Sequence, residues 1–296
     1  DNVFTNLMAA ANLRAAANTC TRHAEAAHAM GVTTEETAAW RDAADSANIP
    51  YDKELGVHPQ CEGFTTLREW DFNSNAVYPL LLHEPYVRLY PAQVVKQPDL
   101  VLAMQWQSHA FNAQQKARNV DYYERRTVRD SSLSACTQAV MCAEVGHLEL
   151  AHAYTKEAAM VDLRDLHTNT RDGLHMASLA GAWTALVGGF GGLRDDEHLL
   201  SLNPHLPEGI SRLTFGLRWR NFRLRAVVDH TEVTYLLRDG PDGELTIRHA
   251  GDDLTLSTRE PTTVAIKACP PLLPEPPQPP GREPQWRGRR LSAHPD

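Results

Sequence analysis

The sequence predicts a mainly α-helical protein that continues into a small antiparallel β-sheet domain and ends in a disordered proline-rich tail. Apolar residues recur every three or four positions from Val3 to about Phe190, and they alternate with polar residues after Gly192. From Pro270 onward the chain holds nine of its 19 prolines and few apolar residues. We therefore expect three segments, with the ranges 1–198, 199–268 and 269–296.

The helical spacing is clearest in three runs, at Val3 to Ala27, Leu133 to Ala143 and Leu174 to Leu186. The first run starts at the beginning of the chain without an initiator methionine or a capping approach, so we expect the chain to begin within a domain. Shorter helices are expected over 34–48, 98–107, 113–123 and 148–162. Long polar loops separate them, among them residues 51–88, and loops of that length in compact domains usually serve a function.

The strands follow the helices in the order of the chain. Residues 213–219 and 222–228 alternate apolar with polar side chains, which is typical of half-buried strands. A turn at Asp239 to Gly243 separates two further strands, expected at 233–237 and 244–249. The tail cannot bury enough apolar surface to offset the entropy of ordering, so we expect it to be disordered.

Composition excludes several classes of protein. A net charge of −8 argues against a nucleic-acid binder. No apolar run reaches the roughly 20 residues of a membrane span, and no signal peptide opens the chain. Five scattered cysteines without a CxxC pair indicate reduced thiols in a cytoplasmic protein. His147, His152 and His167 lack metal-ligand spacing, so we expect no metal site and no cofactor.

Two polar turns open helical runs and are candidates for an anion site. The first is Arg129 to Ser134, and the second is Asn169 to Ser178. Helix starts carry unpaired N–H groups and the positive end of the helix dipole, and the serines and His175 add directional donors. The alternative is that Asp130 or Ser131, and Asp172, serve only as helix N-caps.

Several sequence blocks, taken in order, resemble glycoside hydrolase family 65, which contains the maltose, trehalose, kojibiose and nigerose phosphorylases. The similarity runs from Asp1 to about Ile266. The matching blocks are Asp1-Asn2 with Thr5-Asn6, Asn12-Leu13, Val95 to Asp99, Asn119 to Glu124 with Thr127, Asp130 to Ser134, Asn169 to Ala177, and Asn203 to Pro207.

The resemblance implies that residues 1–198 form the C-terminal half of an (α/α)6 catalytic barrel and that a small β-sheet domain follows. It also places the general-acid glutamate just upstream of Asp1, so we expect no catalytic acid in this chain. Half a barrel leaves helix faces without partners, and we expect the isolated chain to associate or aggregate.

The same resemblance assigns binding roles to six residues. Lys96 and Gln97 correspond to a pair that binds the hydroxyls of the glucosyl unit. The phosphate-binding residues are expected to be Ser131, Ser132, Gly173 and His175. A phosphorylase needs one acid and a phosphate pocket, whereas an inverting hydrolase needs a second carboxylate to activate water. None of Ser131, Ser132 and His175 is replaced by Asp or Glu, which favours phosphorolysis.

The expected reaction is therefore cleavage of an α-linked glucose disaccharide by phosphate, giving β-glucose 1-phosphate and glucose, with inorganic phosphate as co-substrate. A family hydrolase of trehalose or a related α-glucoside, and an inactive fragment lacking the acid, are the alternatives. The resemblance also allows a homodimer of the full-length enzyme. Tyr122, Tyr123 and Glu124 lie beside the serine turn, where packing roles are favoured over lining the cleft, and Trp183 is expected in the core.

Overall fold

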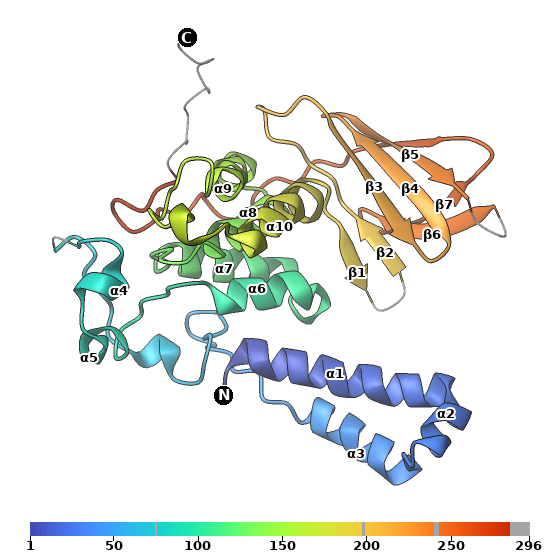
Figure 1. Cartoon of the computed structure of the whole chain (residues 1–296), viewed down its shortest axis with the longest axis horizontal. Coiled ribbons are helices and arrows are strands. Elements are labelled where there is room, and N and C mark those ends of the chain that lie inside the picture. Colours follow the sequence, from blue (N-terminus) through green and yellow to red (C-terminus); the bar gives the residue numbers. More distant parts are fainter. Residues whose placement is uncertain (75, 197–198, 240–242, 285–296) are drawn as a thin grey trace.

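The computed structural model describes residues 1–74, 76–196, 199–239 and 243–284. A helical unit precedes a unit of two β-sheets, as predicted (Figure 1). The helices of the first unit are α1 (Val3–Arg22), α2 (Ala24–Ala29), α3 (Thr34–Asp45), α4 (Leu80–His83), α5 (Tyr86–Leu89), α6 (Asp99–Trp106), α7 (Ala113–Glu124), α8 (Ser134–Glu144), α9 (Leu148–Met160) and α10 (Met176–Thr184), with 3₁₀ turns at Phe64–Thr66, Ser108–Ala110 and Thr170–Asp172 and a π-helical turn at Ala185–Phe190.

The first helices form a hairpin that extends from the rest of the molecule (Figure 1). Asn2 caps α1 by accepting the N–H of Thr5, and Thr33 caps α3 by accepting the N–H of Glu36. The single helix predicted from Val3 to Ala27 is interrupted at His23, whose backbone leaves the helical conformation. The expected long loop at 51–88 contains the short helices α4 and α5.

Helix α8 lies at the centre of the helical unit. Ten of its eleven residues are buried, because it packs against α9, α6, α10 and the π-helical turn. Small side chains allow the close approach, and a Cβ added at Gly181 of α10 would lie 2.5 Å from the Cys136 sulfur. All five cysteines are free thiols. No helix in the described ranges is long and apolar enough to cross a membrane.

The second unit contains two four-stranded sheets, with strand orders β1-β2-β6-β7 and β3-β4-β5-β8. The strands are β1 (Arg194–Asp196), β2 (Leu199–Leu202), β3 (Leu213–Trp219), β4 (Phe222–Val228), β5 (Glu232–Arg238), β6 (Glu244–His249), β7 (Asp252–Ser257) and β8 (Thr262–Ala265). All neighbours are antiparallel except β2 and β6, which are parallel. Because β1 pairs with β2, the sheet begins before residue 199.

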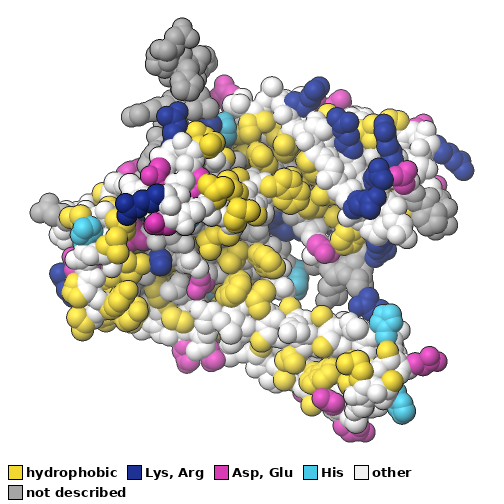
Figure 2. All heavy atoms as spheres, in the orientation of Figure 1, with side chains coloured by type: hydrophobic (Ala, Val, Ile, Leu, Met, Phe, Trp, Pro, Cys, Tyr) yellow, Lys and Arg dark blue, Asp and Glu magenta, His cyan; other side chains and the backbone are white. Residues whose placement is uncertain are grey.

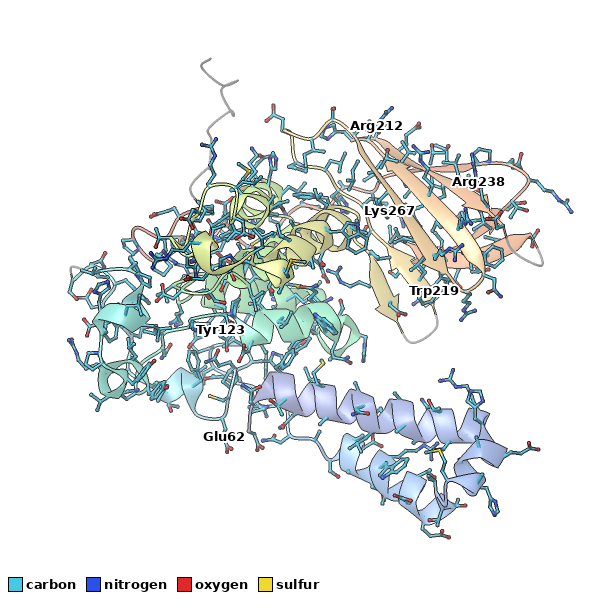
Figure 3. The ribbon with its side chains drawn as sticks, in the orientation of Figure 1. Glu62, Tyr123, Arg212, Trp219, Arg238 and Lys267 are labelled. Carbon is cyan, nitrogen blue, oxygen red and sulfur yellow. The ribbon has the colours of Figure 1, made fainter. Side chains whose placement is uncertain are left out.

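The predicted alternation sets which side chains enter the core. In β4, Leu224 and Ala226 are buried, whereas Arg223 and Arg225 face solvent. Figure 2 shows Lys and Arg side chains gathered over the outer face of this sheet, and Figure 3 labels Arg212 and Arg238 there.

A half-buried ion-pair cluster joins the two units. Glu144 at the end of α8 pairs with Lys116 of α7 at 2.5 Å and with Arg194 of β1. Burial raises the pKa of the Glu144 carboxyl, but Arg194 and Lys116 outweigh burial and hold that pKa below its ordinary value. Such a cluster fixes how the two units are oriented more than it stabilises the fold, because the cost of desolvating the charges offsets much of their mutual attraction.

The prediction of a disordered tail is wrong for residues 269–284, which we call the C-terminal strap. The strap leaves the sheets and returns across the helical unit (Figure 1). Pro276, Gln278 and Pro279 are buried in it. Prolines lose little backbone freedom on ordering, so a few specific contacts can hold such a segment. Residues 285–296 lie outside the described residues.

One apolar face of the helical unit is open to solvent. Met176 and Trp183 of α10 are 69% and 53% exposed, and Trp106 at the end of α6 is 64% exposed. Trp183 is therefore a surface residue, contrary to the prediction that it lies in the core. Trp106 and Trp183 line one cleft of about 660 Å³, and Figure 2 shows hydrophobic side chains gathered over this part of the molecule. The barrel half implied by the resemblance stays a prediction.

We expect the 296-residue chain to self-associate through this face, because burying large apolar side chains is favourable. Replacing Met176 and Trp183 together by Gln should weaken association by about a hundredfold or more, at roughly 1.5 kcal/mol or more for each of the two side chains. Light scattering over a concentration series measures this. Met30→Gln is the control, since Met30 is 81% exposed at the end of α2. Equal association of both variants would contradict the assignment.

Candidate functional site

Two chain segments run side by side and bring together four of the six predicted binding residues, whereas Gly173 and His175 lie on a separate turn. Val95 and Thr127 form a parallel bridge. The Val95 N–H donates to the Arg126 carbonyl at 2.9 Å, and the Val128 N–H donates to the Val95 carbonyl at 2.9 Å. The first segment continues into α6 and the second into α8, so two helix starts follow the bridge.

The sugar-binding pair and the serine turn are in direct contact. The Ser131 hydroxyl donates to Oε1 of Gln97 at 3.0 Å, and the Ser134 hydroxyl donates to the Lys96 carbonyl at 3.2 Å. Lys96 and Gln97 are exposed, and Ser131 and Ser132 are half-buried. The structure therefore joins two groups of residues that lie over 30 positions apart in the sequence.

A cleft of about 590 Å³ opens beside this contact. Lys96, Gln97 and Asp99 line one part of it, and aromatic residues that include Tyr86 and Tyr90 line another. The two tyrosine rings are stacked, with centroids 5.3 Å apart. Burial raises the pKa of the Asp99 carboxyl, and a hydrogen bond from Gln97 partly opposes this shift. Polar groups beside exposed aromatic faces are typical of carbohydrate sites.

The two turns leave their helix starts without side-chain caps. The N-cap residues are Leu133 for α8 and His175 for α10, and neither side chain accepts a helix N–H. The alternative prediction that Asp130 or Ser131, and Asp172, are the N-caps is therefore wrong. The Ser131 hydroxyl oxygen accepts the N–H of Leu133 at 3.3 Å, one residue before the helix. Uncapped starts keep the backbone donors and the positive dipole end that attract anions.

Asp130 instead points into the protein. Its side chain is 1% exposed, accepts the Leu81 N–H at 3.1 Å, and lies 3.5 Å from the Arg282 guanidinium. The preceding residue, Arg129, has a left-handed backbone with φ of 53° and forms an ion pair with Glu157 at 3.2 Å. This local geometry directs Asp130 inward at the residue that precedes Ser131.

His175 is held by a carboxylate that the sequence did not indicate. Its ring Nδ1 lies 2.6 Å from one oxygen of Asp162, and its backbone N–H donates to the other at 2.9 Å. The His167 ring lies 5.8 Å from the His175 ring. Burial lowers the pKa of His167, as does nearby His175, while Asp130 acts in the opposite direction. Asp162 lies on the turn after α9, 13 residues before His175, so no local motif reveals the pair.

Gly173 is exposed, with φ of 132°. A Cβ placed there would meet nothing within 4 Å, so backbone conformation, and not crowding by neighbouring residues, requires glycine. The structure thus places Gly173 on the open turn before His175. Its phosphate-binding role stays a prediction, as do the roles of the other five residues.

Behind the serine turn lies a buried polar cluster around Glu124. Its carboxylate accepts from Tyr154 at 2.6 Å and from Gln138 at 2.6 Å. Burial raises the pKa of Glu124, although these hydrogen bonds oppose the shift. Tyr122 and Tyr123 are also buried. The three residues are therefore packed in the interior, as favoured from the sequence.

The histidines outside the site have packing roles in the structure. His147 is buried, and the ring of half-buried His152 lies 6.3 Å from that of Phe190. Burial lowers the pKa of both histidines. Within the described ranges, no group of three or more His, Cys, Asp or Glu side chains has the geometry to hold a metal ion.

Comparisons with known proteins agree along most of the chain. Residues 1–184 match the glycosyl hydrolase family 65 central catalytic domain, and residues 193–256 match the family's C-terminal domain. An uncharacterized glycosyl hydrolase of Mycobacterium tuberculosis is 77% identical over 97% of the chain and 36% of its own length. An alpha,alpha-trehalose phosphorylase of Geobacillus stearothermophilus is 38% identical over 90% of the chain and 36% of its own length.

A similar structure is also known. It is assigned provisionally as a kojibiose phosphorylase from the human microbiome, and it matches with a TM-score of 0.77 and 28% identity over 89% of this chain and 35% of that one. The chain thus spans about a third of the length of the relatives that it matches.

The Asp162–His175 pair predicts a specific pH dependence of stability. The hydrogen bond from His175 holds the pKa of Asp162 below its ordinary 3.8. A carboxyl with a lowered folded pKa stabilises the protein above its unfolded pKa, and this contribution is lost as pH falls through the folded pKa. Asp162→Asn should therefore have a lower free energy of unfolding than the parent at neutral pH. The difference between the two free energies should shrink as the pH falls.

Urea unfolding from neutral pH to about pH 2 measures that gap. Asp42→Asn is the control for loss of one carboxylate, because Asp42 is exposed on α3. A gap for Asp162→Asn that stayed constant across the whole range would contradict the proposed origin of the stabilisation.

Proposed function

Because this chain belongs to glycosyl hydrolase family 65, we propose that it supplies the sugar- and phosphate-binding part of an inverting disaccharide phosphorylase. The reaction is cleavage of an α-linked glucose disaccharide by inorganic phosphate, giving β-glucose 1-phosphate and glucose. The hydrogen bond between Ser131 and Gln97 is the observation that carries the proposal, since it sets the expected phosphate turn against the expected glucosyl site. The phosphorylase names of the Geobacillus relative and of the similar structure from the human microbiome support it.

The chemistry follows from this neighbourhood. A phosphate oxygen forms a bond to the anomeric carbon while the glycosidic C–O bond breaks, and a general acid protonates the departing oxygen. Lys96 and Gln97 hold the hydroxyls of the glucosyl ring, and Ser131 and Ser132 orient the dianion on the opposite side from the leaving group. We place the acid upstream of Asp1, as the family resemblance implies.

His175 completes the proposed phosphate pocket. With Nδ1 against Asp162, its other ring nitrogen, Nε2, is the one left to donate to phosphate. Asp162 is thus a positioning residue for His175 in this proposal, and Gly173 adds a backbone donor.

A hydrolase would need a carboxylate that activates water. Four acidic residues lie at or beside the proposed site: Asp162 is bound to His175 and Asp99 lines the cleft, while Asp130 and Asp172 belong to the two turns. Asp130 is buried against Leu81 and Arg282 and is not presented to the cleft. Asp172 is 72% exposed beside Arg171. Asp130 is thus not available as that base, and the hydroxyl and N–H donors of the two turns favour phosphate over water as the nucleophile. Hydrolysis of trehalose or a related α-glucoside, and an inactive chain, are the competing outcomes of the assay.

Phosphate dependence tests the reaction class. A protein extended upstream to the length of the curated relatives should release glucose from trehalose or kojibiose only when phosphate is present, with β-glucose 1-phosphate in equal amount. Proton and phosphorus NMR identify the product and its anomeric configuration. Glucose released equally well without phosphate would establish hydrolysis, and no release from any α-linked glucose disaccharide would favour the inactive alternative.

Ser131→Ala tests the phosphate turn in the same extended protein. Loss of one hydrogen bond to a charged group, worth about 1.5 to 3 kcal/mol, should raise the KM for phosphate by roughly tenfold to a hundredfold. The KM for the disaccharide should change less, and Ser46→Ala, at an exposed position after α3, should alter neither. Steady-state kinetics with each substrate varied separately measures both constants. An unchanged phosphate KM would remove Ser131 from the pocket.

A further inference from the structure

The C-terminal strap follows a fixed path over the helical unit. At its start, the strap passes Gly146, between α8 and α9. A Cβ added at Gly146 would lie 2.8 Å from the Cys269 carbonyl oxygen and 2.9 Å from the Pro271 nitrogen. The close approach requires glycine there, and the φ of 90° at Gly146 favours glycine as well.

The middle of the strap reaches the buried cluster behind the serine turn. Gln278 is 7% exposed, and its amide donates to the Glu124 carboxylate at 3.3 Å and to the Pro276 carbonyl at 2.9 Å. Glu124 is the residue that Tyr154 and Gln138 also contact. The strap therefore contributes one donor to a fully buried carboxylate.

The end of the strap contacts the serine turn itself through Arg282. The Arg282 Nε donates to the Val128 carbonyl, and its Nη2 lies 3.5 Å from Oδ1 of Asp130. Its guanidinium also lies over the Tyr78 ring, 4.9 Å from the centroid. Arg282 is 20% exposed, so these contacts form in a largely dry environment.

Val128 and Asp130, which Arg282 contacts, flank the left-handed residue Arg129, and Asp130 directly precedes Ser131. Apart from Arg282, Oδ1 of Asp130 is buried without a hydrogen-bond partner among the described residues. Removing the guanidinium would leave a buried carboxylate uncompensated, which is costly unless the turn moves to reach water. The Val128 carbonyl would lose its contact at the same time.

We propose that Arg282 is a positioning residue that fixes the Val128–Ser132 turn, so that Ser131 and Ser132 are presented to inorganic phosphate. This inference rests on the phosphate role assigned to the turn under the proposed function. Arg282 acts through Val128 and Asp130 and does not itself contact the anion. A segment at the far end of the chain thereby sets the affinity for the nucleophile.

Two measurements on the 296-residue chain separate the inference from the proposed function. Hydrogen–deuterium exchange of residues 128–134 reports whether the turn is held, and calorimetric titration with inorganic phosphate reports binding. Arg282→Ala should exchange faster in this segment and bind phosphate about tenfold more weakly. Arg282→Lys, which keeps the charge but not the two-sided contact, should fall between it and the parent. Arg212→Ala, at an exposed arginine that directly precedes β3 (Figure 3), should match the parent.

A glycine pair supplies a second test that leaves Arg282 intact. Gly146 and Gly251 both have φ of 90°, but a Cβ at Gly251 meets nothing within 4 Å. Alanine at either position carries the same backbone strain, and only Gly146→Ala displaces the strap. Faster exchange at 128–134 and weaker phosphate binding in Gly146→Ala alone would support positioning by the strap.

The other results of exchange and phosphate titration bear separately on the positioning role of Arg282 and on the phosphate role of the turn. Unchanged exchange at 128–134 in Arg282→Ala, with the fold intact by circular dichroism, overturns the positioning role. Faster exchange with unchanged phosphate affinity overturns its link to phosphate. A parent chain that shows no phosphate binding, while Arg282→Ala still loosens the turn, overturns the phosphate role of the turn and leaves the positioning by Arg282 standing.

Discussion

The two backbone hydrogen bonds that pair Val95 with Arg126 and Val128 determine where the other parts of the site lie. A parallel pairing of two segments that each run into a helix puts both helix starts at the same end of the helical unit. Gln97 and Ser131 meet for that reason, although 34 residues separate them in the chain. Backbone pairing does not depend on side-chain identity, so the neighbourhood of the two turns is set independently of the residues that do the binding.

Buried charge on the inner side of the turn complements the open donors on its outer side. Arg129 pairs with Glu157, Asp130 faces Arg282, and Glu124 takes hydrogen bonds from three neutral side chains. These ion pairs and hydrogen bonds connect most of the cluster and favour one geometry. Oδ1 of Asp130, Oε1 of Gln138 and Oε2 of Glu157 are buried without a hydrogen-bond partner among the described residues. Rigid support from behind allows Ser131 and Ser132 to remain half-exposed while keeping a fixed orientation. The left-handed backbone at Arg129 is tolerated because these contacts overdetermine it.

Periodicity predicted most elements, because it depends only on local burial. The strands at 213–219, 222–228 and 244–249 agree with the structure residue for residue, and the helices at 113–123 and 148–162 differ only at their ends. Contacts across long separations were not predictable in this way. The sequence around Asp130 is typical of a helix N-cap, but its side chain points inward to Arg282. No sequence pattern near Asp162 indicates its hydrogen bond to His175. The prediction of disorder from composition was also wrong for residues 269–284, because a few specific contacts with the helical unit order a segment that has little apolar surface.

The return of the strap to α8 and α9 changes how the sheet unit relates to the rest of the chain. The chain leaves the helical unit after the π-helical turn, builds both sheets, and then comes back to set Arg282 against Val128. Topologically, the two sheets are an insertion within the helical unit, and not an appendage at its end. Two crossings tie the units together, so the sheets cannot rotate freely about a single linker. The two family domains separate between residues 184 and 193. A chain divided there would leave residues 269–284 with the sheets, although these residues pack on the helical unit.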